Sequence, residues 1–124
     1  MKDKIEMGLR ILIGVLLLMS GLNKFFNFMQ MPELTDSAGS FMMALFSTGY
    51  IFPIIGLVEI VGGGLLISGK LVPFALIILA PIVINIALFH IILDPAGIGM
   101  AVFLILAMSW IAWNRKDAFF GLFL

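Results

Sequence analysis

The sequence contains no cysteine and few charged residues. Without cysteine the chain cannot form a disulfide, hold an iron–sulfur cluster or use a thiol in chemistry. Charged residues make up only 11% of its 124 residues, against about a quarter in an ordinary soluble domain. A domain this small exposes much of its surface, and so few charges cannot cover it when 63% of the residues are hydrophobic and the mean hydropathy is +1.25. A soluble globular domain is therefore excluded.

A surplus of charge of either sign is missing as well. Seven basic residues balance seven acidic ones, so nothing in the net charge would attract nucleic acid. The chain has long apolar runs instead. A membrane-spanning helix needs about 20 mostly apolar residues, whereas strands of a membrane barrel would appear as alternating runs of about ten. The sequence therefore predicts an all-α integral membrane protein, an antiparallel bundle of four transmembrane helices that forms one domain over residues 1–124. The expected helices are about 5–26, 51–69, 71–93 and 96–113.

Basic residues near the ends of the spans predict the orientation. Lys2 and Lys4 before the first apolar run are typical of a signal peptide. Arg10 interrupts that run, however, and no small-residue cleavage site follows it, so we expect a retained helix. Six of the seven basic residues fall at the end of the bundle that carries both termini, and only Lys24 falls at the other end. Because Lys and Arg are enriched in cytoplasmic loops, both termini are expected in the cytoplasm.

One long loop, residues 27–50, is expected on the outer side. Thr35, Asp36 or Ser37 can cap a short helix over about 36–48. Such a helix either lies in the outer membrane interface or acts as a lid over a pocket between the spanning helices, and the sequence leaves both readings open. Its apolar face at helical spacing consists of Ala38, Phe41, Met42, Leu45 and Phe46.

Small residues and charges share one face of each of the first two spans, at 100° per residue. Glycines allow another helix to approach closely in lipid, and charges avoid lipid, so both arguments turn these faces inward. The expected packing glycines are Gly14, Gly21, Gly56 and Gly63, and the inward charges are Arg10, Lys24 and Glu59.

Polar side chains converge in the outer half of the bundle and are candidates for lining a cavity. Glu59 lies well inside the core, where a charged carboxylate costs about 2.5–3.5 kcal/mol on insertion scales. It either pairs with Lys24 or His90, or it is protonated. Such a residue marks a functional site by default, although a structural bond that locks the helices together satisfies the same constraint. The cavity candidates are Ser20, Asn23, Lys24, Glu59, Asn85 and His90.

The third span constrains the geometry of that cluster. Pro81 removes one helix hydrogen bond and is expected to kink the helix. Asn85 and His90 are five residues apart, about 140° around an ideal helix, so both face one cavity only if a kink or a π-bulge rotates the outer end. His90 is either a proton carrier or quinone ligand, or a helix-end residue bonded to Asp94. Asp94 followed by Pro95 is itself typical of a helix N-cap, here that of the fourth helix.

The order and spacing of these motifs resemble the DoxX family of small membrane proteins, over nearly the whole chain. The resemblance implies a four-helix protein of the bacterial inner membrane. It also implies a link to redox proteins, since the related DoxD protein is a membrane subunit of a thiosulfate:quinone oxidoreductase. The positions that fit the family pattern are Arg10, Ser20, Gly21, Lys24, Glu59, Asn85 and His90. The segments that carry the likeness are GLRILIGVLLLMSGLNKFF at 8–26, TGYIFPIIGLVEIVGGGLLISG at 48–69, VPFALIILAPIVINIALFH at 72–90 and LDPAGIG at 93–99.

Three functions follow as hypotheses. The first is an accessory membrane subunit, with no catalytic residue of its own, that binds a quinone or a lipid-like small molecule in the outer cavity in a redox-linked role. The second is a small-solute carrier, which would need a homo-oligomer because four helices are few for alternating access. The third is a structural assembly partner of other membrane or redox proteins. The sequence holds no evident nucleophile–base pair, and a lone histidine cannot assemble a usual metal site, so an enzyme acting alone has the least support.

Overall fold

The computed structural model describes residues 2–26 and 36–121, and within this part of the chain all regular structure is helical. Four helices are long and apolar enough to cross a membrane, the fourth including a short 3-10 turn at its start. The prediction of an all-α membrane fold with four spanning helices and a short helix in the loop between the first two is therefore confirmed. The elements are α1 (Lys2–Phe26), α2 (Asp36–Ser47), α3 (Ile51–Ser68), α4 (Val72–Ile92), the 3-10 turn Pro95–Gly97, α5 (Ile98–Asn114) and α6 (Lys116–Phe120).

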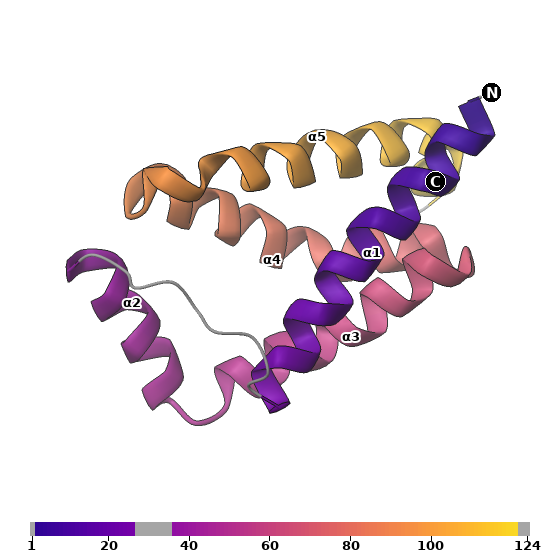
Figure 1. Ribbon diagram of the computed structural model, residues 1–124. Helices are drawn as coiled ribbons and strands as arrows, with labels where there is room; N and C mark the ends of the chain where they lie inside the picture. Colours follow the sequence, from indigo (N-terminus) through magenta and orange to yellow (C-terminus); the bar gives the residue numbers. More distant parts are fainter. Residues whose placement is uncertain (1, 27–35, 122–124) are drawn as a thin grey trace.

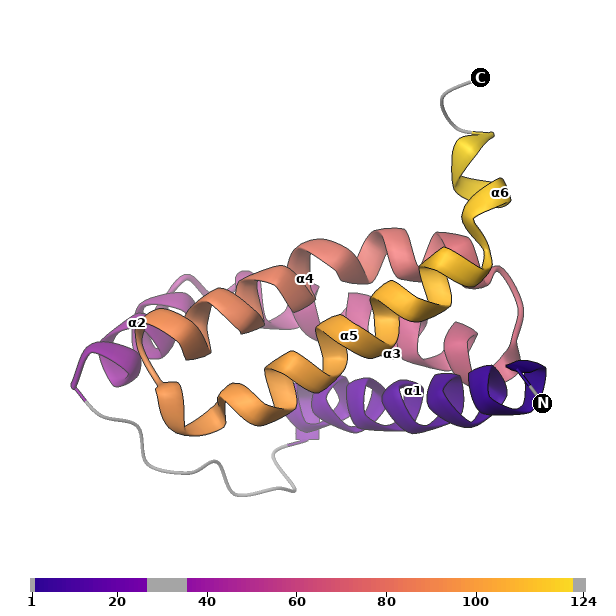
Figure 2. The same cartoon turned by 90° about the horizontal axis from the view of Figure 1, so that it is seen from above.

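The four spanning helices run alternately in opposite directions along the bundle (Figure 1). α1 packs most extensively against α3, and α4 packs against both α3 and α5, whereas α1 and α5 touch only sparingly. The start of α1 and the end of α5 lie at one end of the bundle, called here the terminal end, and α2 lies at the opposite end, called the α2 end. Seen from above, α6 turns away from the axis of α5 (Figure 2).

Local sequence signals explain most helix ends. The hydroxyl of Thr48 accepts a hydrogen bond of 3.2 Å from the backbone N–H of Ile51, where α3 begins. α3 ends at Gly69, whose φ of 79° is readily adopted only by glycine. α4 starts immediately after Leu71, and so short a turn makes α3 and α4 antiparallel neighbours. Residues 27–35, which include the cap candidate Thr35, lie outside the described residues.

The fourth span begins with a 3-10 turn and not directly with the α-helix expected from about residue 96. Pro95–Gly97 forms a 3-10 turn, and α5 itself starts at Ile98. Asp94 stands at the N-cap position of that turn, yet its side chain makes no capping hydrogen bond. Its carboxylate faces the imidazole of His90 instead. The capping role expected for the Asp94 side chain is thus wrong, although the Asp-Pro pair marks the helix start. The short α6 after Arg115 is an element that the apolar pattern did not predict.

The backbones of α1 and α3 meet at glycines. A Cβ atom added to Gly14 would lie 2.8 Å from the carbonyl oxygen of Gly63, and one added to Gly21 would lie 2.6 Å from that of Gly56. Real side chains do not tolerate such distances, so the two helices can pack this closely only with glycine at these positions. The close approach sets the position of every side chain that α1 and α3 present to each other.

An apolar core lies between the helices, and each spanning helix contributes to it. Ile13, Leu66, Leu79 and Ile111 are fully buried there. The outward faces are equally apolar, with large exposed side chains on every span. Helices that are apolar all round suit either a large protein interior or a lipid environment, and only lipid is available around a bundle of this size.

Candidate functional site

A cavity of about 430 Å³ lies between α1, α3 and α4 and is bordered by α2. Its volume falls within the range of small-molecule sites, about 300–1,000 Å³. Apolar side chains of α2, α3 and α4 form most of its wall. Its polar side chains are Ser20, Lys24, Glu59, Asn85, His90 and Asp94. Five of the six cavity candidates taken from the sequence are therefore brought together, while the sixth, Asn23, is buried but does not line the cavity.

An ion pair between α1 and α3 forms one polar side of the cavity. The Lys24 ammonium donates a hydrogen bond of 2.7 Å to Glu59 Oε1 and another of 3.1 Å to the hydroxyl of Ser20. The Glu59 side chain is 1% exposed and that of Lys24 19%. A carboxylate so far from water is stabilised by a partner of opposite charge. Of the two partners considered from the sequence, Lys24 is the one that Glu59 contacts in the structure.

The glycine contacts explain how this pair is positioned. Ser20 and Lys24 are four residues apart and so lie on one face of α1. A Cβ atom at Gly21 would lie 3.0 Å from the Cβ of Glu59, which shows how closely α3 passes this turn of α1. Close packing of α1 and α3 thus places the Glu59 carboxylate within hydrogen-bonding distance of Lys24.

His90 and Asp94 form a second polar group, at the end of α4. His90 Nδ1 lies 3.1 Å from the backbone carbonyl oxygen of Asp94 and 3.4 Å from its carboxylate oxygen Oδ2. A Cβ atom added to Gly97 would collide with the imidazole ring. The ring can therefore pack against the 3-10 turn only because residue 97 is glycine. An imidazole whose Nδ1 faces a carboxylate is held in one orientation, with Nε2 as its second hydrogen-bonding atom.

Asn85 lines the same cavity from α4, one helical turn after Pro81. Asn85 and His90 therefore both face one cavity, although an ideal helix would separate them by about 140°. The amide of Asn85 has no hydrogen-bond partner among residues 2–26 and 36–121. A polar side chain in a membrane usually finds a partner, so this amide is available to a ligand.

α2 supplies an apolar wall that the sequence identified only as a face of uncertain use. Its side chains Phe41, Met42 and Leu45 line the cavity. The ring of Phe41 lies 5.7 Å from that of Phe89 on α4, centroid to centroid. At the other end of α2, Phe46 and Phe52 meet edge to face at 5.9 Å. These two aromatic contacts tie α2 to α4 and α3.

A comparison with protein-family models matches residues 6–91 to the model named DoxX. The chain belongs to the DoxX family. No curated protein and no solved structure matches it. The DoxX match covers the first three spans with Lys24, Glu59, Asn85 and His90, and it ends before Asp94. The partner that positions His90 therefore lies beyond the segment matched to the family.

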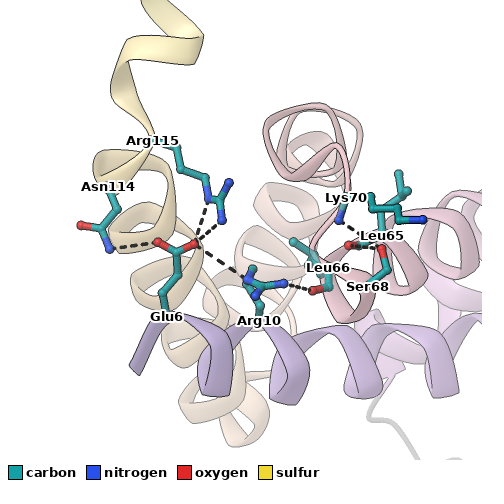
Figure 3. A network of polar contacts seen from close by, with 8 residues as sticks. All are labelled: Glu6, Arg10, Leu65, Leu66, Ser68, Lys70, Asn114 and Arg115. Atoms are coloured by element: carbon teal, nitrogen blue, oxygen red, sulfur yellow. Dashed lines mark hydrogen bonds and ion pairs between the residues drawn. The ribbon is translucent and has the colours of Figure 1, made fainter. Parts of the chain in front are cut away.

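A further polar group of this DoxX-family chain, at the end opposite α2, was not predicted. At the terminal end, Glu6 is buried and accepts hydrogen bonds from Arg115 and Asn114, and it lies 3.8 Å from Arg10 (Figure 3). Arg10, expected to be inward-facing, donates a hydrogen bond of 2.8 Å to the carbonyl oxygen of Leu66. In the sequence, Glu6 is one acid within a charged terminal stretch, and the signal that could have singled it out is its one-turn spacing from Arg10.

Proposed function

We propose that this DoxX-family protein is an accessory membrane subunit that binds a quinone or a lipid-like small molecule in the cavity around Glu59, in a redox-linked role. The observation that carries the proposal is the Lys24–Glu59 ion pair, which lies in the wall of an otherwise largely apolar cavity within the spanning region. Intramembrane charges that border a cavity are usually retained for function.

The donor set fits an amphipathic ligand. An oxygen of such a ligand can accept a hydrogen bond from the amide of Asn85, which has no partner in the described part of the chain, or from Lys24 at the edge of its ion pair. The apolar body would pack against the aromatic and aliphatic side chains of α2 and α4. A bound quinone would supply electron-transfer chemistry, and the residues of this chain would orient it and exclude water.

The proposal includes a role for α2 as the lid of the cavity. Phe41, Met42 and Leu45 border the cavity directly, and α2 contacts the neighbouring helices through two aromatic pairs. A helix that only lay in the interface would not need to contribute a wall to the cavity. Separating the Phe41 and Phe89 rings would open a path for a ligand from the membrane side.

Contacts in the half of the bundle away from the cavity favour ligand binding over transport as the function. There the backbones of Gly14 and Gly63 are in contact, and Glu6 links α1 to the end of α5. A carrier would have to separate these contacts to open the cavity to the terminal end. The same glycine contacts are used within the chain, which removes the main sequence feature that suggested binding of another protein's span.

The proposed location is the bacterial inner membrane, with both termini in the cytoplasm. The support is the distribution of basic residues, six of which lie at the terminal end, together with their preference for the cytoplasmic side. The cavity would then open in the outer half of the membrane.

The test is the melting temperature of the purified protein in detergent, with and without a short-chain ubiquinone analogue. We expect the quinone to raise the melting temperature of the wild type and of Asp117→Asn, a carboxylate-to-amide control on an exposed residue far from the cavity. We expect Glu59→Gln to lose this increase. The absence of any quinone-dependent increase in the wild type, or an unchanged increase in Glu59→Gln, would contradict the proposal.

A further inference from the structure

At the terminal end, one buried carboxylate faces two guanidinium groups (Figure 3). Arg115 donates to Glu6 Oε1 through Nε at 2.8 Å and Nη2 at 2.5 Å. Arg10 Nε lies 3.8 Å from the same oxygen, too far for a hydrogen bond. Asn114 donates to the other carboxylate oxygen at 3.4 Å. The cluster of Glu6, Arg10 and Arg115 therefore carries one positive charge more than its carboxylate balances.

The cluster also has donors without acceptors. Arg10 uses Nη1 to bond the carbonyl of Leu66 at 2.8 Å. Its Nε is buried and has no hydrogen-bond partner within residues 2–26 and 36–121. Leaving a buried donor of a charged group unbonded is costly. Arg115 is the more exposed of the two, with 33% of its side chain accessible against 12% for Arg10. An anion approaching from the surface would first meet the partly exposed guanidinium of Arg115 and the excess positive charge of the cluster.

The surroundings place this cluster at the level of lipid headgroups. It lies at the ends of the spanning helices α1 and α5, next to Trp113, which is 64% exposed and has the Lys116 ammonium 4.4 Å from its ring centre. Tryptophan and lysine are typical of the membrane interface. The terminal end carries six basic residues against three acidic ones, Asp3, Glu6 and Asp117.

We propose that Arg10 and Arg115 form a binding site for the phosphate of an anionic phospholipid headgroup in the leaflet at the terminal end. Glu6 holds Arg115 in position, and the phosphate supplies the acceptor and the negative charge that the cluster lacks. A guanidinium presents several donors to phosphate oxygens at once. Exposed apolar side chains next to the cluster on α1, Ile5 and Met7, provide a surface for the acyl chains, which a free phosphate would not use.

The natural tryptophans provide the probe. Trp110 and Trp113 are the only two in the chain, and both precede Arg115 by at most five residues. The protein is reconstituted in bilayers that mix phosphatidylcholine with phosphatidylglycerol, and one lipid at a time carries bromine in its acyl chains. Quenching of tryptophan fluorescence by each brominated lipid gives the ratio of the two binding constants. For the wild type we expect phosphatidylglycerol to be favoured by about fivefold, which is the effect of one basic group facing anionic lipid.

Single substitutions distinguish a specific binding site at Arg115 from general attraction between surface charge and anionic lipid. Arg115→Gln should bring the ratio close to one, whereas Arg115→Lys, which retains the charge, should keep part of the preference. Lys4→Gln removes the same charge from an exposed position at the same end and should change the ratio less than Arg115→Gln does.

Three results would overturn the proposal. One is a wild-type ratio of one. Another is an equal reduction of the ratio by Arg115→Gln and Lys4→Gln, because general attraction to the membrane surface would then explain the preference. The third is loss of the preference when inorganic phosphate is added at constant ionic strength, because the site would then belong to a free anion and not to a lipid headgroup.

Discussion

The ammonium of Lys24 lies 2.7 Å from a carboxylate oxygen of Glu59, a side chain that is 1% exposed. This contact joins the last turn of α1 to the middle of α3, and it also forms part of the cavity wall. The pair is therefore expected to stabilise the bundle and to supply the polar side of a ligand site. The two roles can be tested separately. The free energy of unfolding reports the contribution to stability, and the ligand-dependent rise in melting temperature reports ligand binding.

Removing only Lys24 should lower the free energy of unfolding more than replacing both members of the Lys24–Glu59 pair. Lys24→Met leaves the buried carboxylate without its partner and should lower the free energy of unfolding by about 3–5 kcal/mol. The double variant Lys24→Met with Glu59→Gln should recover much of this loss, because no uncompensated charge remains. Reversible unfolding in mixed micelles measures both. If the two single changes simply add in the double variant, the proposed coupling is wrong.

Asn85 should matter for the ligand and not for the fold. Since its amide has no hydrogen-bond partner in the described part of the chain, Asn85→Leu should change the free energy of unfolding by less than about 0.5 kcal/mol. It should nevertheless reduce the quinone-dependent rise in melting temperature. Ile84→Leu, at an exposed position of the same helix that does not line the cavity, serves as the control. A large loss of stability in Asn85→Leu without ligand would assign a structural role to the amide.

The glycine contacts between α1 and α3 should tolerate no side chain. Gly21→Ala places a Cβ atom 2.6 Å from the carbonyl oxygen of Gly56, and this overpacking should cost about 1–3 kcal/mol of stability. A Cβ atom at Gly64 meets nothing within 4 Å. Gly64→Ala should therefore be neutral or stabilise the protein by up to about 1 kcal/mol, because alanine favours helix. Equal effects of the two substitutions on thermal unfolding would contradict this packing.

Much of the fold could be predicted because the membrane imposes strict requirements on composition. Apolar runs of sufficient length identify the spanning helices, and the high cost of an isolated charge selects Lys24 and Glu59. The Glu6–Arg115 contact could not be found this way, because the two residues are 109 positions apart and each resembles an ordinary flanking charge. The sequence offered Asp94 both as an N-cap and as a partner of His90, which is one helical turn away. Asp94 occupies the N-cap position, but its carboxylate faces His90 and does not cap the helix.

The position of the His90 side chain depends on Gly97. Gly97→Ala should displace the imidazole, because a Cβ atom there would collide with the ring. The displaced ring should then react faster with diethylpyrocarbonate, which modifies accessible histidine, and the chain contains only one histidine. Gly99→Ala, where a Cβ atom meets nothing within 4 Å, should leave the rate unchanged. A rate in Gly97→Ala equal to that of the wild type would mean that the turn does not position His90.

We propose that the cavity around Glu59 holds an amphipathic small molecule under α2. Photolabelling of the reconstituted protein with an azidoquinone, followed by mass-spectrometric mapping, tests it most directly. We predict labels on the cavity side of α2 and α4, at residues such as Met42, Ile86 and Phe89, and their loss in Glu59→Gln or with excess unlabelled quinone. Labels spread over the lipid-facing sides of the helices, or labels that excess quinone does not displace, would contradict the claim.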